Sequence, residues 1–171
     1  MILIPKFQNI IELGGTLSIL HYDIDGKLID DRFYSNIVVT VGKQHIAARM
    51  KDGGIPVQMG YMAIGGNATP GSNPAKTTPV VGDTQLSTGG TPALSELARV
   101  ALTTAGGTVS GAVVTYSANF GAGTGTGSLI EAGIFNAAGA AAPTMLCKTS
   151  FDVVNKAAND SIAVTWTVTI Q

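Results

Sequence analysis

Charged side chains are scarce in this sequence. Only 12% of its 171 residues are Asp, Glu, Lys or Arg, about half of the ~25% that is usual in soluble domains. The net charge of -1 leaves no excess of Lys or Arg to neutralise phosphates, so nucleic acid is not an expected partner. A soluble monomer uses surface charge to stay apart from its copies. A surface filled instead with Gly, Ala, Thr and Ser favours a subunit of an assembly, and the alternative is a Thr- and Ser-rich β protein with a neutral surface.

Cysteine and histidine are almost absent as well. The single cysteine, Cys147, rules out a disulfide framework and a cysteine-based zinc site, and we expect it to be an inert buried thiol. The two histidines, His21 and His45, stand in no triad or zinc motif. We therefore expect no catalytic, cofactor-binding or metal-binding residues, and a protein that is not an enzyme.

No segment of the sequence suggests a membrane. The apolar start, residues 1–4, is far too short to span a bilayer and lacks the basic segment of a signal peptide. No polybasic run suggests binding to a membrane surface. We expect no membrane partner.

Two short motifs resemble ligand-binding loops without fitting them. The glycines of residues 121–127 alternate as GxGxGxG, whereas a dinucleotide loop needs GxGxxG and a P-loop needs GxxxxGK followed by Ser or Thr. The sequence Asp23-Ile24-Asp25-Gly26 begins like a calcium loop, but its glycine comes too early and the closing Glu is missing. Asp-Gly is also a hairpin signal, so we expect a turn here, with calcium as the alternative.

Glu131 is the most interesting carboxylate because it lies between Ile130 and Ala132 in an apolar strand. A half-buried Glu can serve as a general acid. It can equally pair with a basic group such as Lys148 or Arg99, or face a neighbouring subunit. We favour a structural role.

Hydrophobic periodicity predicts short strands separated by turns. The clearest strand is 161–170, where Ile162, Val164, Trp166, Val168 and Ile170 share one face and a row of Thr occupies the other. The other predicted strands are 16–22, 28–34, 36–41, 57–64, 94–102, 113–120, 129–135 and 144–151, with a loop at 153–159. One short helix is predicted near 43–51, with Ile46, Ala47 and Met50 on its apolar face.

This pattern predicts an all-β fold, an antiparallel β-sandwich or a jelly-roll-like barrel, because no βαβ rhythm is present. We expect a single domain over residues 14–171, preceded by an apolar arm, residues 1–13, that docks on its own sheet or on a neighbour's. A long loop near 65–91, rich in Gly, Pro and Thr, is expected to be pinned by contacts, including contacts with neighbouring subunits.

Several phrases of the sequence carry a resemblance when taken together. They are NIVVTVGKQHIAARM at 36–50, MGYMAIG at 59–65, ELARV at 96–100, GTGTGSLIEAGIFN at 123–136 and VNKAANDSIAVTWTVT at 154–169. Their order over residues 17–170 resembles a group of small virion structural proteins of tailed bacteriophages. None of these phrases has an assigned chemical role, so the resemblance transfers no functional residue.

The resemblance implies an oligomeric component of a phage particle, assembled in the cytoplasm of the bacterial host. A capsid decoration, or cement, protein is the first expectation: a homo-oligomer, with a trimer favoured, that contacts the major capsid protein or other virion subunits. The alternatives are a tail, neck or fibre-attachment protein and a host-glycan-binding module. An aromatic content of 6%, with Trp166 expected in the core, disfavours the glycan-binding alternative.

Overall fold

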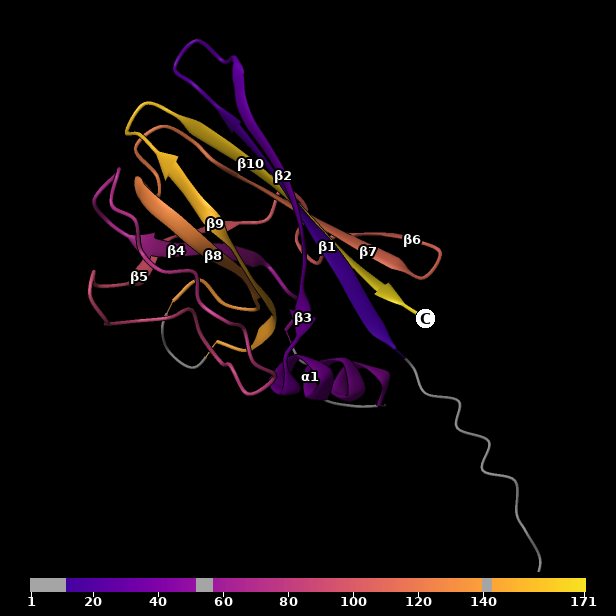
Figure 1. Cartoon of the computed structure of the whole chain (residues 1–171). Coiled ribbons are helices and arrows are strands. Elements are labelled where there is room, and N and C mark those ends of the chain that lie inside the picture. The colour runs from indigo at the N-terminus through magenta and orange to yellow at the C-terminus, as the bar shows by residue number, and fades with distance from the viewer. Residues whose placement is uncertain (1–11, 52–56, 140–142) are drawn as a thin grey trace, which may run out of the picture.

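The computed structural model describes residues 12–51, 57–139 and 143–171, which form a β-sandwich. The described residues contain ten strands and one helix, and the strands form two separate five-stranded antiparallel sheets (Figure 1). The predicted all-β sandwich is therefore confirmed, and the sheets do not close into the barrel that was its alternative.

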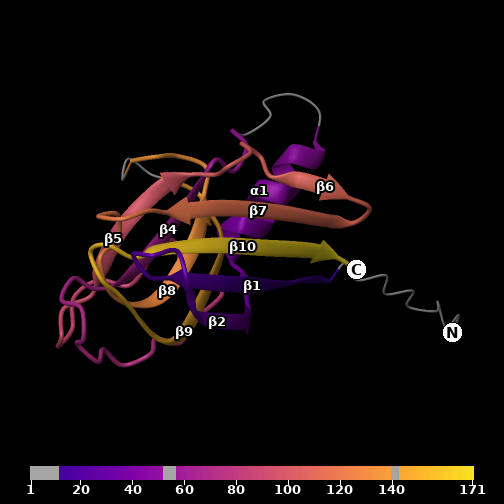
Figure 2. The ribbon, with the colours of Figure 1, turned by 90° about the horizontal axis from the view of Figure 1, so that it is seen from above.

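Each sheet mixes strands that are distant in the sequence. Sheet A contains, in spatial order, β2 (Leu28–Ser35), β1 (Leu13–Tyr22), β10 (Ser161–Ile170), β7 (Val113–Phe120) and β6 (Thr108–Ser110). Sheet B contains β3 (Ile37–Val38), β9 (Met145–Lys156), β8 (Gly127–Phe135), β4 (Tyr61–Asn67) and β5 (Ser95–Ala101). In Figure 2, strands β1, β10 and β7 of sheet A lie side by side, with β10 running toward the C-terminus and its two neighbours running the opposite way.

The main core lies between the two sheets. Period-two alternation points one side of each strand inward, and in sheet A the register places Leu17, Trp166 and Tyr116 in one row across β1, β10 and β7. Leu17 and Trp166 are completely buried. Of the five predicted inward residues of β10, four are buried and Ile170, at the strand end, is 42% exposed.

A second layer covers the other face of sheet B. Residues 68–94, here called the covering loop, connect β4 to β5 and place Leu86 against Phe135 and Met145. Every residue of β8 is buried, because one face of the strand meets the core and the other meets the covering loop. The covering loop matches the long loop predicted near 65–91, and the contacts that pin it are made by its own chain.

The helix α1 (Thr40–Met50) packs against β9 at one end of the sandwich. A Cβ at Gly42 would clash with the carbonyl oxygen of Leu146, so glycine allows the helix backbone to approach the strand closely. The predicted apolar face was wrong in part: the helix buries Gly42 and His45, whereas Met50 is 75% exposed. The helix packs through its first half, and its last turn projects beyond the strand.

Two other predictions need correction, and one strand was missed. The strand expected at 36–41 pairs only at Ile37–Val38, because the chain enters α1 at Thr40; packing here outweighs the strand preference of Thr40 and Val41. The loop expected at 153–159 is mostly strand, since β9 continues to Lys156. The short edge strand β6 was not predicted.

The predicted N-terminal arm, residues 1–13, lies outside the described residues except for Glu12 and Leu13. Leu13 opens β1, and Glu12 exchanges two backbone hydrogen bonds of 2.9 Å with Gln171. In the part of the chain that is described, no helix is long and apolar enough to cross a membrane.

Truncation of Trp166 tests the core between the sheets. Trp166→Ala should lower the free energy of unfolding by about 3–5 kcal/mol, because it leaves a cavity in the central row of sheet A. Chemical denaturation measures this change. Phe33→Ala is the control: Phe33 lies on the same sheet but is 70% exposed, and its loss should stay within about 0.5 kcal/mol. Similar losses in both variants would contradict the assignment of Trp166 to the core.

Candidate functional site: a buried ion pair and the pocket beside it

Glu131 lies on the face of β8 that the covering loop closes, and it is completely buried. The covering loop supplies the hydrogen-bond donors for its carboxylate. Ser87 donates its backbone N–H to Oε1 and its hydroxyl to Oε2 at 2.9 Å, and the hydroxyl of Thr77 donates to Oε2 at 3.0 Å. Thr77 and Ser87 of the covering loop thus satisfy the only carboxylate of β8.

Lys148, on the neighbouring strand β9, supplies the balancing charge. Its Nζ lies 3.2 Å from Oε2 of Glu131 and 3.3 Å from Oδ2 of Asp83, a residue of the covering loop. Nζ also donates to the hydroxyl of Ser87 at 3.2 Å and to the carbonyl of Gln85 at 3.4 Å. Because only 3% of Lys148 is exposed, both charges of the pair are removed from water.

This arrangement supports a structural role for Glu131. The carboxylate is hydrogen-bonded to the covering loop, paired with Lys148 and completely buried. The predicted pairing with Lys148 is confirmed. Arg99, the other predicted candidate, pairs with Glu96 instead.

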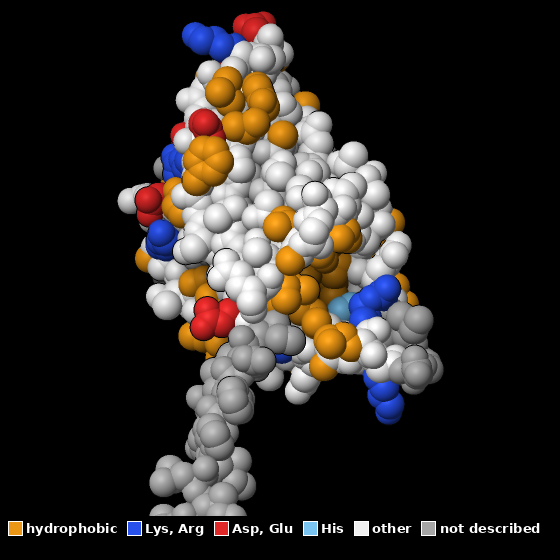
Figure 3. Space-filling model, turned by 90° about the vertical axis from the view of Figure 1, so that its right-hand side faces the viewer, with side chains coloured by type: hydrophobic (Ala, Val, Ile, Leu, Met, Phe, Trp, Pro, Cys, Tyr) orange, Lys and Arg blue, Asp and Glu red, His pale blue; other side chains and the backbone are white. Residues whose placement is uncertain are grey.

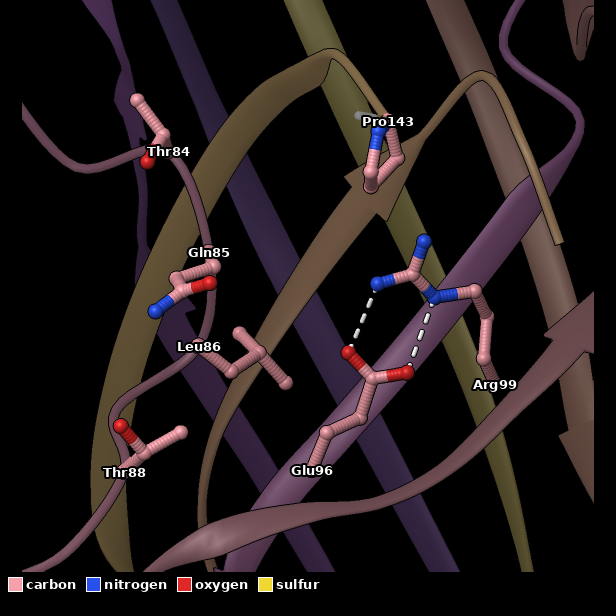
Figure 4. A pocket seen from close by; sticks show the side chains of 7 residues that line it. All are labelled: Thr84, Gln85, Leu86, Thr88, Glu96, Arg99 and Pro143. Carbon is pink, nitrogen blue, oxygen red and sulfur yellow. Dashed lines mark hydrogen bonds and ion pairs between the residues drawn. The ribbon is translucent and has the colours of Figure 1, made fainter. Parts of the chain in front are cut away.

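A pocket of about 550 Å³ lies between the covering loop and β5 (Figure 4). In Figure 4, Leu86 points from the covering loop toward Glu96 and Arg99, and Pro143 stands above the pair. The remaining lining residues are Thr84, Gln85 and Thr88 from the loop.

The one cation of this pocket is already fully engaged. Arg99 donates from Nε and Nη2 to the two carboxylate oxygens of Glu96, at 2.9 and 2.7 Å, and from Nη1 to the carbonyl of Ala137 at 2.9 Å. Its guanidinium lies 3.8 Å from the ring centre of Phe135. The guanidinium therefore holds strand β5 to its surroundings and is not poised to bind an anionic ligand.

The structure separates the two histidines. His21, at the end of β1, hydrogen-bonds Oδ2 of Asp160 at 2.9 Å. His45 lies on α1, beside an apolar groove at the opposite end of β10.

Asp160 belongs to a small polar cluster at one end of the sandwich. Burial disfavours its charged form, but hydrogen bonds from the Ala157 N–H and from His21, with the nearby charge of Lys156, outweigh burial and lower the pKa of Asp160. The completely buried Lys156 donates to the carbonyls of Gly121 and Asp160, at 3.0 and 2.8 Å. Burial lowers the pKa of Lys156. The cluster joins the β7–β8 and β9–β10 connections to the end of β1.

The two ligand-like motifs form turns. Asp23 Oδ1 accepts the backbone N–H groups of Asp25 and Lys27, which closes the predicted hairpin turn. The glycine run leads into β8 and not into a helix, so it lacks the helix N-terminus that a phosphate loop uses. Among the described residues, no three His, Cys, Asp or Glu side chains are grouped so that they could hold a metal ion.

Cys147 is completely buried, as predicted. Burial raises the pKa of its thiol well above the usual value, so the thiolate that would make it reactive is disfavoured.

Sequence reasoning missed the loop side of the ion pair, namely Thr77, Asp83 and Ser87. These residues stand in a segment without periodicity, so no pattern connects them to β8. Lys156 was also missed, because the sequence Asn155-Lys156 indicated a loop. Val154 is buried, and Lys156 lies two residues further along the same strand, on the same face. This period-two spacing was the only sequence signal that Lys156 is buried.

Comparison with known proteins gives no relative for this chain. No protein-family model, curated protein or solved structure matches it. The function proposed below therefore rests on the sequence and on the geometry of the described residues.

Breaking the ion pair should release the covering loop. Glu131→Gln leaves the buried Lys148 with only the partly exposed Asp83 as counter-charge, so we expect a loss of about 3–5 kcal/mol in the free energy of unfolding. Trypsin should also cleave faster after Lys76, which lies in the covering loop. Adding Lys148→Met to Glu131→Gln should cost less than the sum of the two single changes.

Asp152→Asn is the matched control for this prediction. Asp152 also pairs a strand with the covering loop, through Lys76 at 3.5 Å, but its side chain is 75% exposed. Its loss should stay within about 1 kcal/mol and leave the cleavage rate unchanged. Equal effects of Asp152→Asn and Glu131→Gln would show that the buried pair does not hold the covering loop.

Proposed function

We propose that this chain is a non-enzymatic structural subunit of a tailed-phage particle, and that it acts as a capsid decoration protein that bridges capsid subunits. The observation that carries the proposal is the outer face of sheet A, whose three central strands, β1, β10 and β7, carry no charged side chain. The resemblance of residues 17–170 to phage virion proteins supplies the type of particle.

The outer face of sheet A is the side turned away from the core. Strands β1 and β10, with 10 residues each, and β7, with 8 residues, contain no Asp, Glu, Lys or Arg. Their outward side chains include Thr16 and Thr167, whose hydroxyl groups lie 2.9 Å apart, and the exposed Thr165. No described helix or strand packs on this face.

The edge of the same face adds an exposed aromatic side chain. Phe33 of β2 is paired in register with Ser18, which points outward because its neighbour Leu17 points into the core. Its side chain is 70% exposed. On the same face of β2, Asp31 lies opposite Leu20 and is exposed, so the charge-free area is limited to β1, β10 and β7. Burial of that area against another protein suits an assembly, because no charge within it must be desolvated.

The alternatives differ in how well the surface suits them. A tail, neck or fibre-attachment protein would use the same uncharged face in a ring, so the number of copies in the particle separates it from a decoration protein. A glycan-binding module would need exposed aromatic rings that line a groove. Trp166, the only tryptophan, is completely buried, which argues against that alternative.

Counting the copies of this chain in purified particles tests its position. A decoration protein covers the capsid lattice, so quantitative mass spectrometry should find on the order of hundreds of copies per particle. About six or twelve copies would identify a tail or neck ring and overturn the decoration role. Absence from the purified particle would overturn the virion proposal itself.

A charge placed on the outer face of sheet A should block assembly without unfolding the chain. Thr165→Glu puts a carboxylate at an exposed position of β10, where burial against a partner would leave it unpaired. We expect the variant to keep its melting temperature and to lose binding to particles that lack the protein, measured by co-sedimentation.

Thr78→Glu is the matched control, since it adds the same charge at an exposed position of the covering loop. It should bind particles as the unmodified chain does. Unimpaired binding by Thr165→Glu would exclude the outer face of sheet A as the contact surface.

A further inference from the structure

An apolar groove opens where sheet A extends past sheet B. It has a volume of about 180 Å³ and lies between the inner face of sheet A and helix α1. Its walls include His45, Ile46, Met59, Val114, Val168 and Ile170. In Figure 3, hydrophobic side chains gather in a hollow with a histidine at its margin.

The groove is a continuation of the core that no described residue fills. Val168 and Ile170 continue the inward row of β10 beyond Trp166, but α1 stands opposite them in place of a strand of sheet B. Burial, together with the nearby charge of Arg49, lowers the pKa of His45 and so favours its neutral imidazole. The groove therefore suits an apolar occupant.

The first described residues, Glu12 and Leu13, lie beside this groove. Residues 1–11 precede Glu12, whose backbone pairs with Gln171, and the next pair along the ladder is Leu13 with Ile170. Ile170 is itself a wall of the groove. An extended chain of this length reaches roughly 36 Å, so the segment is long enough to turn back into the groove.

The composition of residues 1–11 matches that of the groove. Besides Met1, six of these residues are large and apolar, and Lys6 has the only charged side chain among them. The apolar residues are Ile2, Leu3, Ile4, Phe7, Ile10 and Ile11. A chain reversal takes about four residues, so Ile10 and Ile11 are too close to Glu12 to enter. Phe7 is the next apolar residue back, beyond the polar pair Gln8-Asn9, and Asn favours turns.

We propose that the N-terminal arm, residues 1–11, folds back on its own chain and inserts Phe7 into the groove between α1 and sheet A. An engineered apolar cavity of about 150 Å³ holds one benzene ring, so a groove of about 180 Å³ fits a single phenyl group. Tethering favours the chain's own arm over a neighbour's, because a short linker gives an effective concentration in the mM range and a short closure costs little entropy.

Cross-linking of the isolated full-length chain tests this proposal independently of any phage particle. The variant Phe7→Cys with Ile46→Cys places one thiol on the arm and one in the groove, and a short bis-maleimide joins thiols that lie close together. We expect a cross-link within one chain, identified by mass spectrometry of the monomer band. Cys147 should not react, because it is completely buried.

The control pairs Phe7→Cys with Ala48→Cys, an exposed position on the opposite side of the same helix. The intrachain yield should be several-fold higher for Ile46→Cys than for Ala48→Cys. Equal yields would overturn the proposal, and a cross-linked dimer as the main product would assign the groove to the arm of a second copy instead.

If Ile46→Cys does not fold, a pair on β10 replaces it. Phe7→Cys is then combined with Ile170→Cys or with Thr169→Cys. Ile170 faces the groove and is 42% exposed, whereas Thr169 faces the outer side of the same strand. A higher intrachain yield for Ile170→Cys supports the proposal, and equal yields overturn it.

Discussion

Glu131 and Lys148 lie on adjacent strands of sheet B, and the covering loop can close over them only if both charges stay satisfied. Removing an ion pair from water costs several kcal/mol per ion unless hydrogen bonds complete the shell of each charge. The loop supplies those bonds through Thr77, Asp83 and Ser87. Loop and pair therefore depend on each other, and the burial of all of β8 and the small core around Leu86 follow from their association.

This closure makes the two sides of the sandwich unlike. Sheet B has the covering loop on its outer side, so its central strand β8 is buried on both faces and reads as an almost continuous apolar run. Sheet A has no such cover, and β10 keeps a strict alternation of buried and partly exposed residues. A β face that water reaches normally carries charge. Its absence from β1, β10 and β7 is the property that the proposed assembly role explains.

Features encoded by local periodicity were predictable from the sequence, and features that depend on distant contacts were not. The strand at 161–170 follows from its alternation alone, and the turn at Asp23 follows from local side-chain hydrogen bonding. For Glu131 the sequence offered Lys148, Arg99 or a neighbouring subunit as partners, and only the folded chain selects Lys148. The loop partners of the pair were not predicted, because burial of Ser87 or Asp83 depends on where an aperiodic segment of 27 residues, 68–94, comes to lie. The burial of Lys156 was hidden for a related reason: its ammonium group is satisfied by the carbonyl of Gly121, 35 residues away, and by that of Asp160 in the following turn, and both come within reach only in the folded chain.

The closed side and the open side of the sandwich also restrict where contacts between subunits can form. The covering loop occupies the outer face of sheet B with its own chain, so that face offers the irregular loop surface and not a sheet. If the arm fills the groove beside α1, the end of the core is closed from within as well. The outer face of sheet A, uncharged across β1, β10 and β7, then remains open among the described residues. Its Thr and Ser side chains can exchange water for hydrogen bonds to a partner, whereas buried Lys or Glu would each need a counter-charge. Such a face suits repeated packing against a regular lattice of protein subunits better than selective binding of a charged ligand.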